Sequence, residues 1–150
     1  MPVLSPPSSV IRLPDWPARL NALIERRRHM PFKWGLHDCC QFARAAVAEL
    51  RGADPAAGLG KKLRPYKRCS GAALNLHRLG GVEALPMACG LEEMRVTMAQ
   101  RGDVVLVDQV REPSRVGSAL GICLGEQSAF PAKRGLVFVA TLECRRAWRV

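Results

Sequence analysis

The 150-residue sequence lacks the features that define several large classes of protein. Charged residues, glycine or proline interrupt every hydrophobic stretch, so no segment provides the roughly 20 consecutive apolar residues of a membrane-spanning helix. The start of the chain has no signal segment that combines positive charge, an apolar core and small residues. We therefore expect a chain without a membrane span whose cysteines are free thiols.

Motifs for metal binding are also missing. The six cysteines form no C-x-x-C pair, and no histidine follows a cysteine pair at ligand spacing, so the usual zinc signatures are absent. We expect no cofactor and no metal. A metal or iron–sulfur site built by cysteines that converge in space stays open as an alternative, because sequence separation does not forbid it.

Acidic residues are few: 13 Asp and Glu stand against 23 Lys and Arg, which gives a net charge of +10. The basic clusters are spread along the chain, and aromatic residues do not alternate with them as they do on base-stacking surfaces. We therefore expect no nucleic-acid binding, and a basic surface that suits acidic or anionic partners.

The organisation is that of a single domain with an arm. The length and the 48% apolar content suffice for one core. Residues 1–14 contain four prolines and three serines, which favours an extended N-terminal arm that docks on a neighbour. The single domain is expected over residues 15–150.

Hydrophobic periodicity and turn residues predict helices first and strands afterwards. The helices are expected at 16–28 behind an Asp15 N-cap, from 39 to a stop at Gly52, and at 70–79 before Gly80 and Gly81. Residues 53–68 are expected to form a loop, and 82–99 stay unassigned. Strands are expected at 104–107, 119–124, 136–141 and 147–150. This order is typical of an α+β domain with an antiparallel sheet.

The segment from Trp34 to Phe42 holds the strongest candidate for chemistry. Asp38 is a good N-cap residue, so Cys39 would begin a helix. The unpaired amides and the dipole at that helix end stabilise an anion, which lowers the pKa of a thiol placed there. Cys39 is therefore a candidate nucleophile. The alternative remains open at this point that Cys39 and Cys40 are small apolar residues packed at a helix start.

Three short segments, in a consistent order, also carry a resemblance to a known family. Asp38-Cys39-Cys40-Gln41-Phe42 resembles the Asp-Cys-Ser-Gly-Leu/Phe segment that opens the catalytic helix of NlpC-type papain-like cysteine peptidases. Residues 101–106 resemble the family's Pro-Gly-Asp-Leu-Val-Phe turn and strand, and residues 120–125 resemble its Val-Gly-Ile-Tyr-Leu-Gly strand. The resemblance implies a papain-like α+β fold, with N-terminal helices packed on an antiparallel β-sheet and Cys39 in the nucleophile's position.

The sequence is more similar still to small tailed-phage proteins of this fold. In these proteins a Trp-Gly-x-x-Asp-Cys segment precedes the helix and the chain closes on Ala-Trp-Arg-Val, as residues 147–150 do here. The resemblance implies a place among tail-tip proteins in the virion tail, or in the host cytoplasm during assembly. The implied partners are other tail-tip proteins and peptidoglycan.

The sequence departs from the peptidase pattern at one decisive position. The residue before the Val-Gly-Ile-Tyr-Leu-Gly strand is the family's catalytic His, which takes the cysteine proton and later protonates the leaving amine. This sequence has Ala119 there, preceded by Ser118. His37 is the candidate substitute base, because it lies near Cys39 in the sequence, while His29 and His77 are expected to be structural.

The sequence therefore leaves two alternative functions. The first is a structural or assembly subunit of a phage tail tip, in the baseplate or hub region, built on a degenerate peptidase scaffold without the catalytic His. The second is an active cysteine peptidase that cuts peptidoglycan cross-links during phage entry. Ala119 favours the first of these functions.

Overall fold

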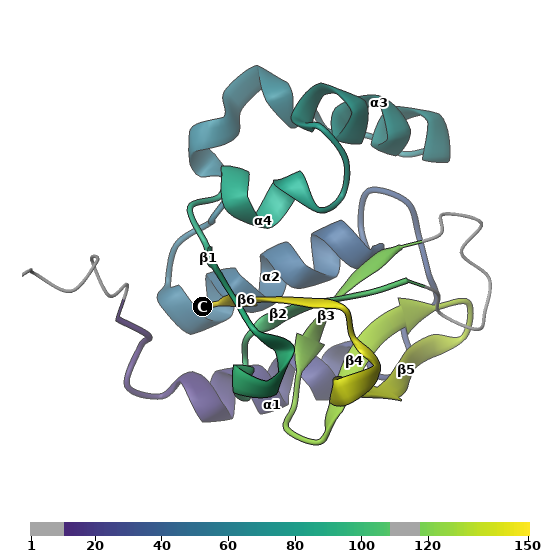
Figure 1. Cartoon of the computed structure of the whole chain (residues 1–150). Coiled ribbons are helices and arrows are strands. Elements are labelled where there is room, and N and C mark those ends of the chain that lie inside the picture. Colours follow the sequence, from purple (N-terminus) through teal and green to yellow (C-terminus); the bar gives the residue numbers. More distant parts are fainter. Residues whose placement is uncertain (1–10, 109–117) are drawn as a thin grey trace, which may run out of the picture.

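The computed structural model of the chain describes residues 11–108 and 118–150. Over these residues the chain is a mixed α+β structure with four α-helices and a six-stranded antiparallel sheet (Figure 1). The expected α+β class with an antiparallel sheet is thus confirmed. Residues 1–10 of the expected arm lie outside the described residues.

Three of the four helices follow the predicted positions closely, and the fourth lies in the unassigned segment 82–99. They are α1 (Trp16–Arg27), α2 (Cys39–Arg51), α3 (Cys69–Leu79) and the short α4 (Ala84–Ala88), with 3₁₀ turns at Ala57–Lys62, Val96–Met98 and Thr141–Glu143. Asp15 occupies the N-cap position of α1 as predicted, but its side chain makes no capping hydrogen bond and instead accepts one from Arg19 at 2.9 Å. In the described residues no helix has the length and apolar character that a membrane span requires.

The strands form one sheet in the order β1-β6-β2-β3-β4-β5. Their bounds are β1 (Glu92–Met94), β2 (Val104–Val107), β3 (Ala119–Cys123), β4 (Gln127–Ala132), β5 (Gly135–Ala140) and β6 (Arg146–Arg149). The four expected strands are present as β2, β3, β5 and β6. Strands β1 and β4 were not predicted; β1 is only three residues long, and β4 contains Pro131, which lacks a backbone donor.

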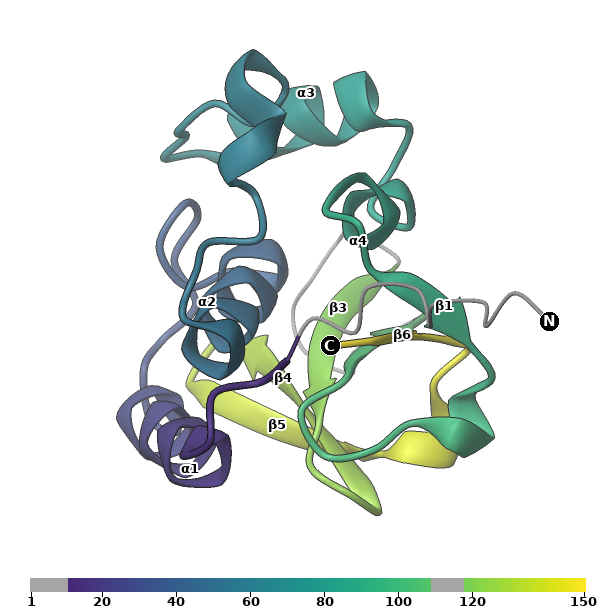
Figure 2. The same ribbon diagram turned by 90° about the vertical axis from the view of Figure 1, so that its left-hand side faces the viewer.

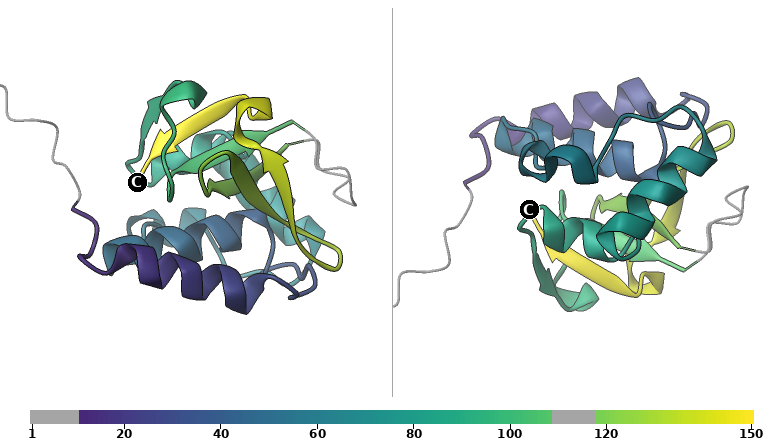
Figure 3. Two further views of the ribbon diagram at one scale, coloured as in Figure 1. Left: turned by 90° about the horizontal axis from the view of Figure 1, so that it is seen from below. Right: turned by 90° about the horizontal axis from the view of Figure 1, so that it is seen from above.

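The helices and the sheet pack in layers. Helices α1 and α2 lie side by side against one face of the sheet (Figure 3), while α3 and α4 lie together at one end of the domain (Figure 2). The main core is between α1, α2 and this sheet face, where Phe42, Leu50 and Trp148 are fully buried. Successive strand residues point to opposite faces, so Val105 and Phe130 form a second cluster on the other side of the sheet.

The two ends of the described domain are joined by Arg12. Its guanidinium donates to the carbonyls of Val150 at 2.8 Å and Arg101 at 2.7 Å, and it pairs with the buried carboxylate of Asp103 at 3.0 Å. It also stacks over the Trp16 ring, with 4.4 Å from the guanidinium carbon to the ring centroid. Residues 11–14, expected to belong to the arm, therefore contact the domain.

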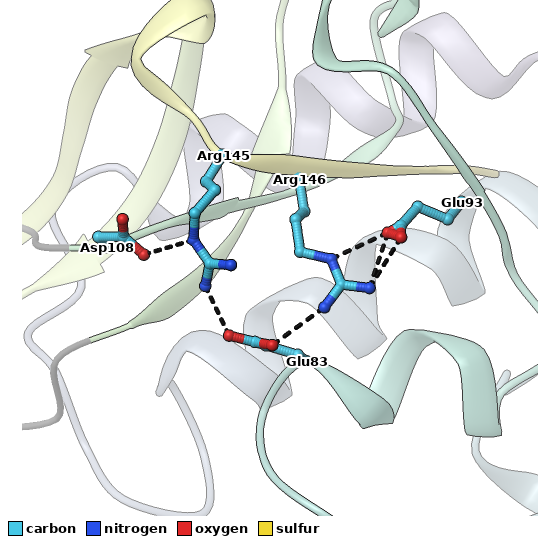
Figure 4. Close-up of polar contacts among 5 residues, drawn as sticks. All are labelled: Glu83, Glu93, Asp108, Arg145 and Arg146. Atoms are coloured by element: carbon cyan, nitrogen blue, oxygen red, sulfur yellow. Dashed lines mark hydrogen bonds and ion pairs between the residues drawn. The ribbon is translucent and has the colours of Figure 1, made fainter.

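An ionic network attaches α4 and β1 to β6 (Figure 4). Arg146 pairs with Glu93 at 2.7 Å and Glu83 at 3.0 Å, and Arg145 connects Glu83 to Asp108. Exposed pairs each contribute little, about 0–1 kcal/mol, but here the two guanidiniums share one carboxylate and fix its position. The network thus ties the start of α4 and strand β1 to Arg145 and Arg146 at the start of β6.

Candidate functional site

Cys39 is the first residue of α2, as the sequence predicts. Asp38 has an extended backbone with φ −105° and ψ 176°, and its Oδ1 accepts a hydrogen bond from the Gln41 amide at 2.8 Å. The helix ends at Gly52 in the left-handed conformation. The N-cap therefore fixes Cys39 at the helix end where the backbone amides face outward and favour an anion.

The second oxygen of Asp38 holds the preceding loop and a distant tyrosine. Oδ2 accepts the Gly35 amide at 2.9 Å and the Tyr66 hydroxyl at 2.5 Å. Gly35 has φ +81°, and a Cβ at this position would lie 1.7 Å from the Tyr66 carbonyl oxygen, so only glycine fits. Burial and the Asp38 charge raise the pKa of Tyr66, which keeps its hydroxyl protonated as the donor.

The two adjacent thiols have opposite tendencies. Their sulfur atoms are 3.9 Å apart, and both side chains are partly exposed. The hydrogen bond from Cys40 lowers the pKa of Cys39, and the Leu120 backbone N–H acts in the same direction, against the effect of burial. The pKa of Cys40 is raised well above its usual value by the same hydrogen bond and by burial. Of the two thiols, Cys39 therefore ionises more readily than Cys40.

The strand opposite Cys39 brings no acid–base group. Ala119 begins β3, is 4% exposed, and belongs to the apolar cluster against which Cys39 packs. A methyl group therefore stands at the place where the peptidase resemblance would put an imidazole.

His37, the candidate substitute base, is held by another residue. Its ring is fully buried, Nδ1 lies 2.9 Å from a guanidinium nitrogen of Arg27, and its ring stands edge-on to Phe42 at 5.9 Å between centroids. Burial, with a contribution from the Arg27 charge, lowers its pKa to about 4. Since Arg27 can only donate, Nδ1 accepts, and the buried Nε2–H has no hydrogen-bond partner among the described residues.

A cavity of about 320 Å³ opens beside Cys39, between the start of α2, α3 and β3. Its size is at the lower end of the range for small-ligand pockets, about 300–1,000 Å³. Its lining is mostly apolar and includes Phe32, Trp34, Leu76 and Ala119. The structure brings together Cys39, Cys40 and Asp38, as the sequence suggests.

Three further residues of this cavity were not assigned to the site from the sequence. Tyr66 lies in a segment expected to be a loop, and no motif marks it. Cys69 and His77 line the opposite wall from α3, and the sequence suggested only a structural role for His77. His77 is exposed, and the described hydrogen bonds include none between it and Cys39.

The side chains of the described residues do not assemble a metal centre. No group of three or more His, Cys, Asp or Glu side chains within residues 11–108 and 118–150 is placed to hold an ion. Cys123 and Cys144 are buried in the second apolar cluster, away from the Cys39 cavity. What the arrangement offers chemically is a thiol whose pKa is lowered, at the start of a helix and beside an apolar cavity.

Comparison with known proteins places the chain in a family whose role has not been assigned. A family model described as a domain of unknown function, DUF6950, matches residues 11–150, so the chain belongs to this family. The match begins one residue before Arg12, in agreement with the contacts that Arg12 makes. No curated protein and no solved structure matches the chain.

Proposed function

We propose that the chain is a structural or assembly subunit of a tailed-phage tail tip, built on an NlpC-type papain-like scaffold that has no catalytic histidine. The observation that carries the proposal is the pairing of Cys39 with Ala119. The thiol lies at the start of a helix that packs on an antiparallel sheet, and it packs against an apolar cluster that contains the buried Ala119.

The chemistry of amide cleavage explains why this arrangement argues against a peptidase. A thiolate can attack a carbonyl, but the departing amine must receive a proton, and an imidazole normally supplies it. His37 cannot do so, because its Nδ1 is occupied by Arg27 and its pKa of about 4 keeps the ring neutral at ordinary pH. In this proposal the chain retains the peptidase scaffold but lacks the imidazole that would act as acid and base beside the thiol.

The tail-tip location rests on the resemblance of the Trp34–Phe42 segment and of residues 147–150 to small tail proteins. The net charge of +10 suits acidic surfaces of neighbouring tail-tip proteins or the anionic cell wall. In this proposal the protein is part of the virion tail, and passes through the host cytoplasm during assembly.

An active peptidase that cuts peptidoglycan is the second candidate. One observation favours it: the exposed His77 lines the same cavity as the low-pKa thiol of Cys39. A shift of α3 toward α2 would bring an imidazole to the sulfur. Catalysis by this route would require both Cys39 and His77.

Incorporation into particles tests the proposal directly. In the phage or prophage that encodes this chain, the protein is expected in purified tails by mass spectrometry, and its deletion is expected to block tail assembly. The Cys39→Ala and His77→Ala variants should both restore assembly and infectivity, because neither side chain is needed for a structural role. Intact tails that lack the protein, or normal tails whose infectivity is lost with Cys39→Ala, would contradict it.

A further inference from the structure

The outer edge of β5 is an unpaired strand edge. This strand is last in the sheet order and pairs only with β4, through a turn at Lys133 and Arg134. Strand alternation directs the backbone groups of every second residue away from β4. The Leu136 N–H points outward in this way and donates to the Arg28 carbonyl at 2.9 Å. Phe138 and Ala140 share this outward orientation, and within the described chain no segment bonds to them on that side.

The Arg28 carbonyl covers this edge at Leu136, and beyond that residue the strand itself has none of the usual protection against pairing. Strand β5 contains no charged residue and no proline, and Phe138 is 36% exposed. Two further apolar residues, Leu142 in the turn that follows β5 and Met98, are 75% and 58% exposed and lie on 3₁₀ turns that pack together. By contrast, β1 at the opposite edge of the sheet is three residues long and begins with two glutamates.

Charge is distributed unevenly along the β5 edge. Its start is basic: Lys133 and Arg134 form the turn, and the Arg28 guanidinium carbon lies 5.7 Å from the centroid of the Phe138 ring. Its end is acidic, because Glu143 follows the strand and the Glu126 carbonyl accepts the Thr141 amide there. Neither Lys133, Arg134, Glu126 nor Glu143 forms a salt bridge within the described residues.

We propose that a second copy of the chain docks on this edge, with the two β5 strands antiparallel. Antiparallel pairing places the basic start of one strand against the acidic end of the other, and two-fold symmetry repeats this contact. A parallel arrangement would put like charges together. Phe138 lies near the two-fold axis, where its exposed ring packs against the other copy. The interface is independent of the Cys39 site and of the proposed tail-tip role.

Charge reversal and rescue test the pairing. Sedimentation equilibrium of the full chain at low ionic strength is expected to show a monomer–dimer equilibrium that weakens as salt is added. Arg134→Glu and Glu143→Lys should each weaken dimerisation by about tenfold or more, since each change is felt at two symmetric contacts. The double variant Arg134→Glu/Glu143→Lys should recover it. Arg78→Glu, an equally exposed position on α3, is the matched control and should have no effect.

The central contact is tested separately. Phe138→Lys brings two like charges to the axis and should leave the chain monomeric, with a far-UV circular dichroism spectrum that shows it to be folded. In the unaltered chain, hydrogen exchange of the Phe138 and Ala140 amides should slow as protein concentration rises. A chain that stays monomeric at low salt, a dimer that is indifferent to Phe138→Lys, or a double charge reversal without recovery would each overturn the proposal.

Discussion

The Ala119→His variant is expected to hydrolyse stem-peptide fragments of peptidoglycan, at a rate about 10²–10⁴-fold above that of the unaltered protein. Ala119 begins β3 and faces Cys39, and its methyl group lines the cavity, so a larger side chain has space. An imidazole there can take the thiol proton and return it to the leaving amine. The measurement is the release of new amino groups from defined fragments.

Two controls separate catalysis from a general effect of the substitution. Ala119→Leu adds a side chain of comparable bulk without acid–base chemistry and should stay as inactive as the unaltered protein. Adding Cys39→Ala to the histidine variant should abolish the gained activity. Robust Cys39-dependent turnover by the unaltered protein would contradict the structural role, and a folded but inactive histidine variant would contradict the papain-like placement of residue 119.

The free energy of unfolding is expected to fall by about 3 kcal/mol between pH 7 and pH 4 through His37 alone. Burial lowers its pKa from 6.5 to about 4 in the folded chain. As the pH drops below 6.5, His37 binds a proton in the unfolded chain but not in the folded chain. Unfolding therefore becomes more favourable until the pH reaches the pKa of His37 in the folded chain. Protonating the folded ring would also place its charge against the Arg27 guanidinium 2.9 Å away.

Urea unfolding across this pH range, compared with a His37→Asn variant, isolates the effect. The asparagine side-chain oxygen can accept from Arg27 but does not titrate, so the stability difference between the two proteins should shrink by about 3 kcal/mol on acidification. Replacement of the exposed His77 by asparagine is the control and should leave the pH dependence as it is. Parallel curves for His37→Asn and the unaltered protein would show that the buried ring does not carry this pH dependence.

The parts of the fold that depend on local sequence could be predicted. The start of α2 follows from Asp38 and its bond to the Gln41 amide, two residues three positions apart. Its end follows from Gly52, whose left-handed backbone suits glycine. The same reasoning placed the start of α1 after Asp15, although the Asp15 carboxylate accepts from Arg19 and makes no capping bond. A capping residue can therefore mark a helix start without its side chain bonding the helix amides.

The strands and the walls of the cavity depend on distant parts of the chain. Strand β4 contains Pro131 and small residues, and it pairs because β3 and β5 lie on either side of it. Tyr66 donates a hydrogen bond to Asp38, which lies 28 positions earlier in the sequence, and no local sequence pattern predicts that contact. His37 was a candidate base because it lies near Cys39 in the sequence. It is instead packed away from the thiol and bound by Arg27 from α1.

The thiol of Cys39 is expected to ionise without an imidazole partner. The rate of its reaction with iodoacetamide as a function of pH is the measurement that tests this expectation. Mass spectrometry of the peptide that contains Cys39 would give the rate at each pH. We expect one ionisation step, with a midpoint below the usual pKa of a cysteine thiol because the hydrogen bond with Cys40 stabilises the Cys39 thiolate. A second step in the range where histidine titrates, with reactivity persisting into acid, would reveal a thiolate–imidazolium pair and contradict it.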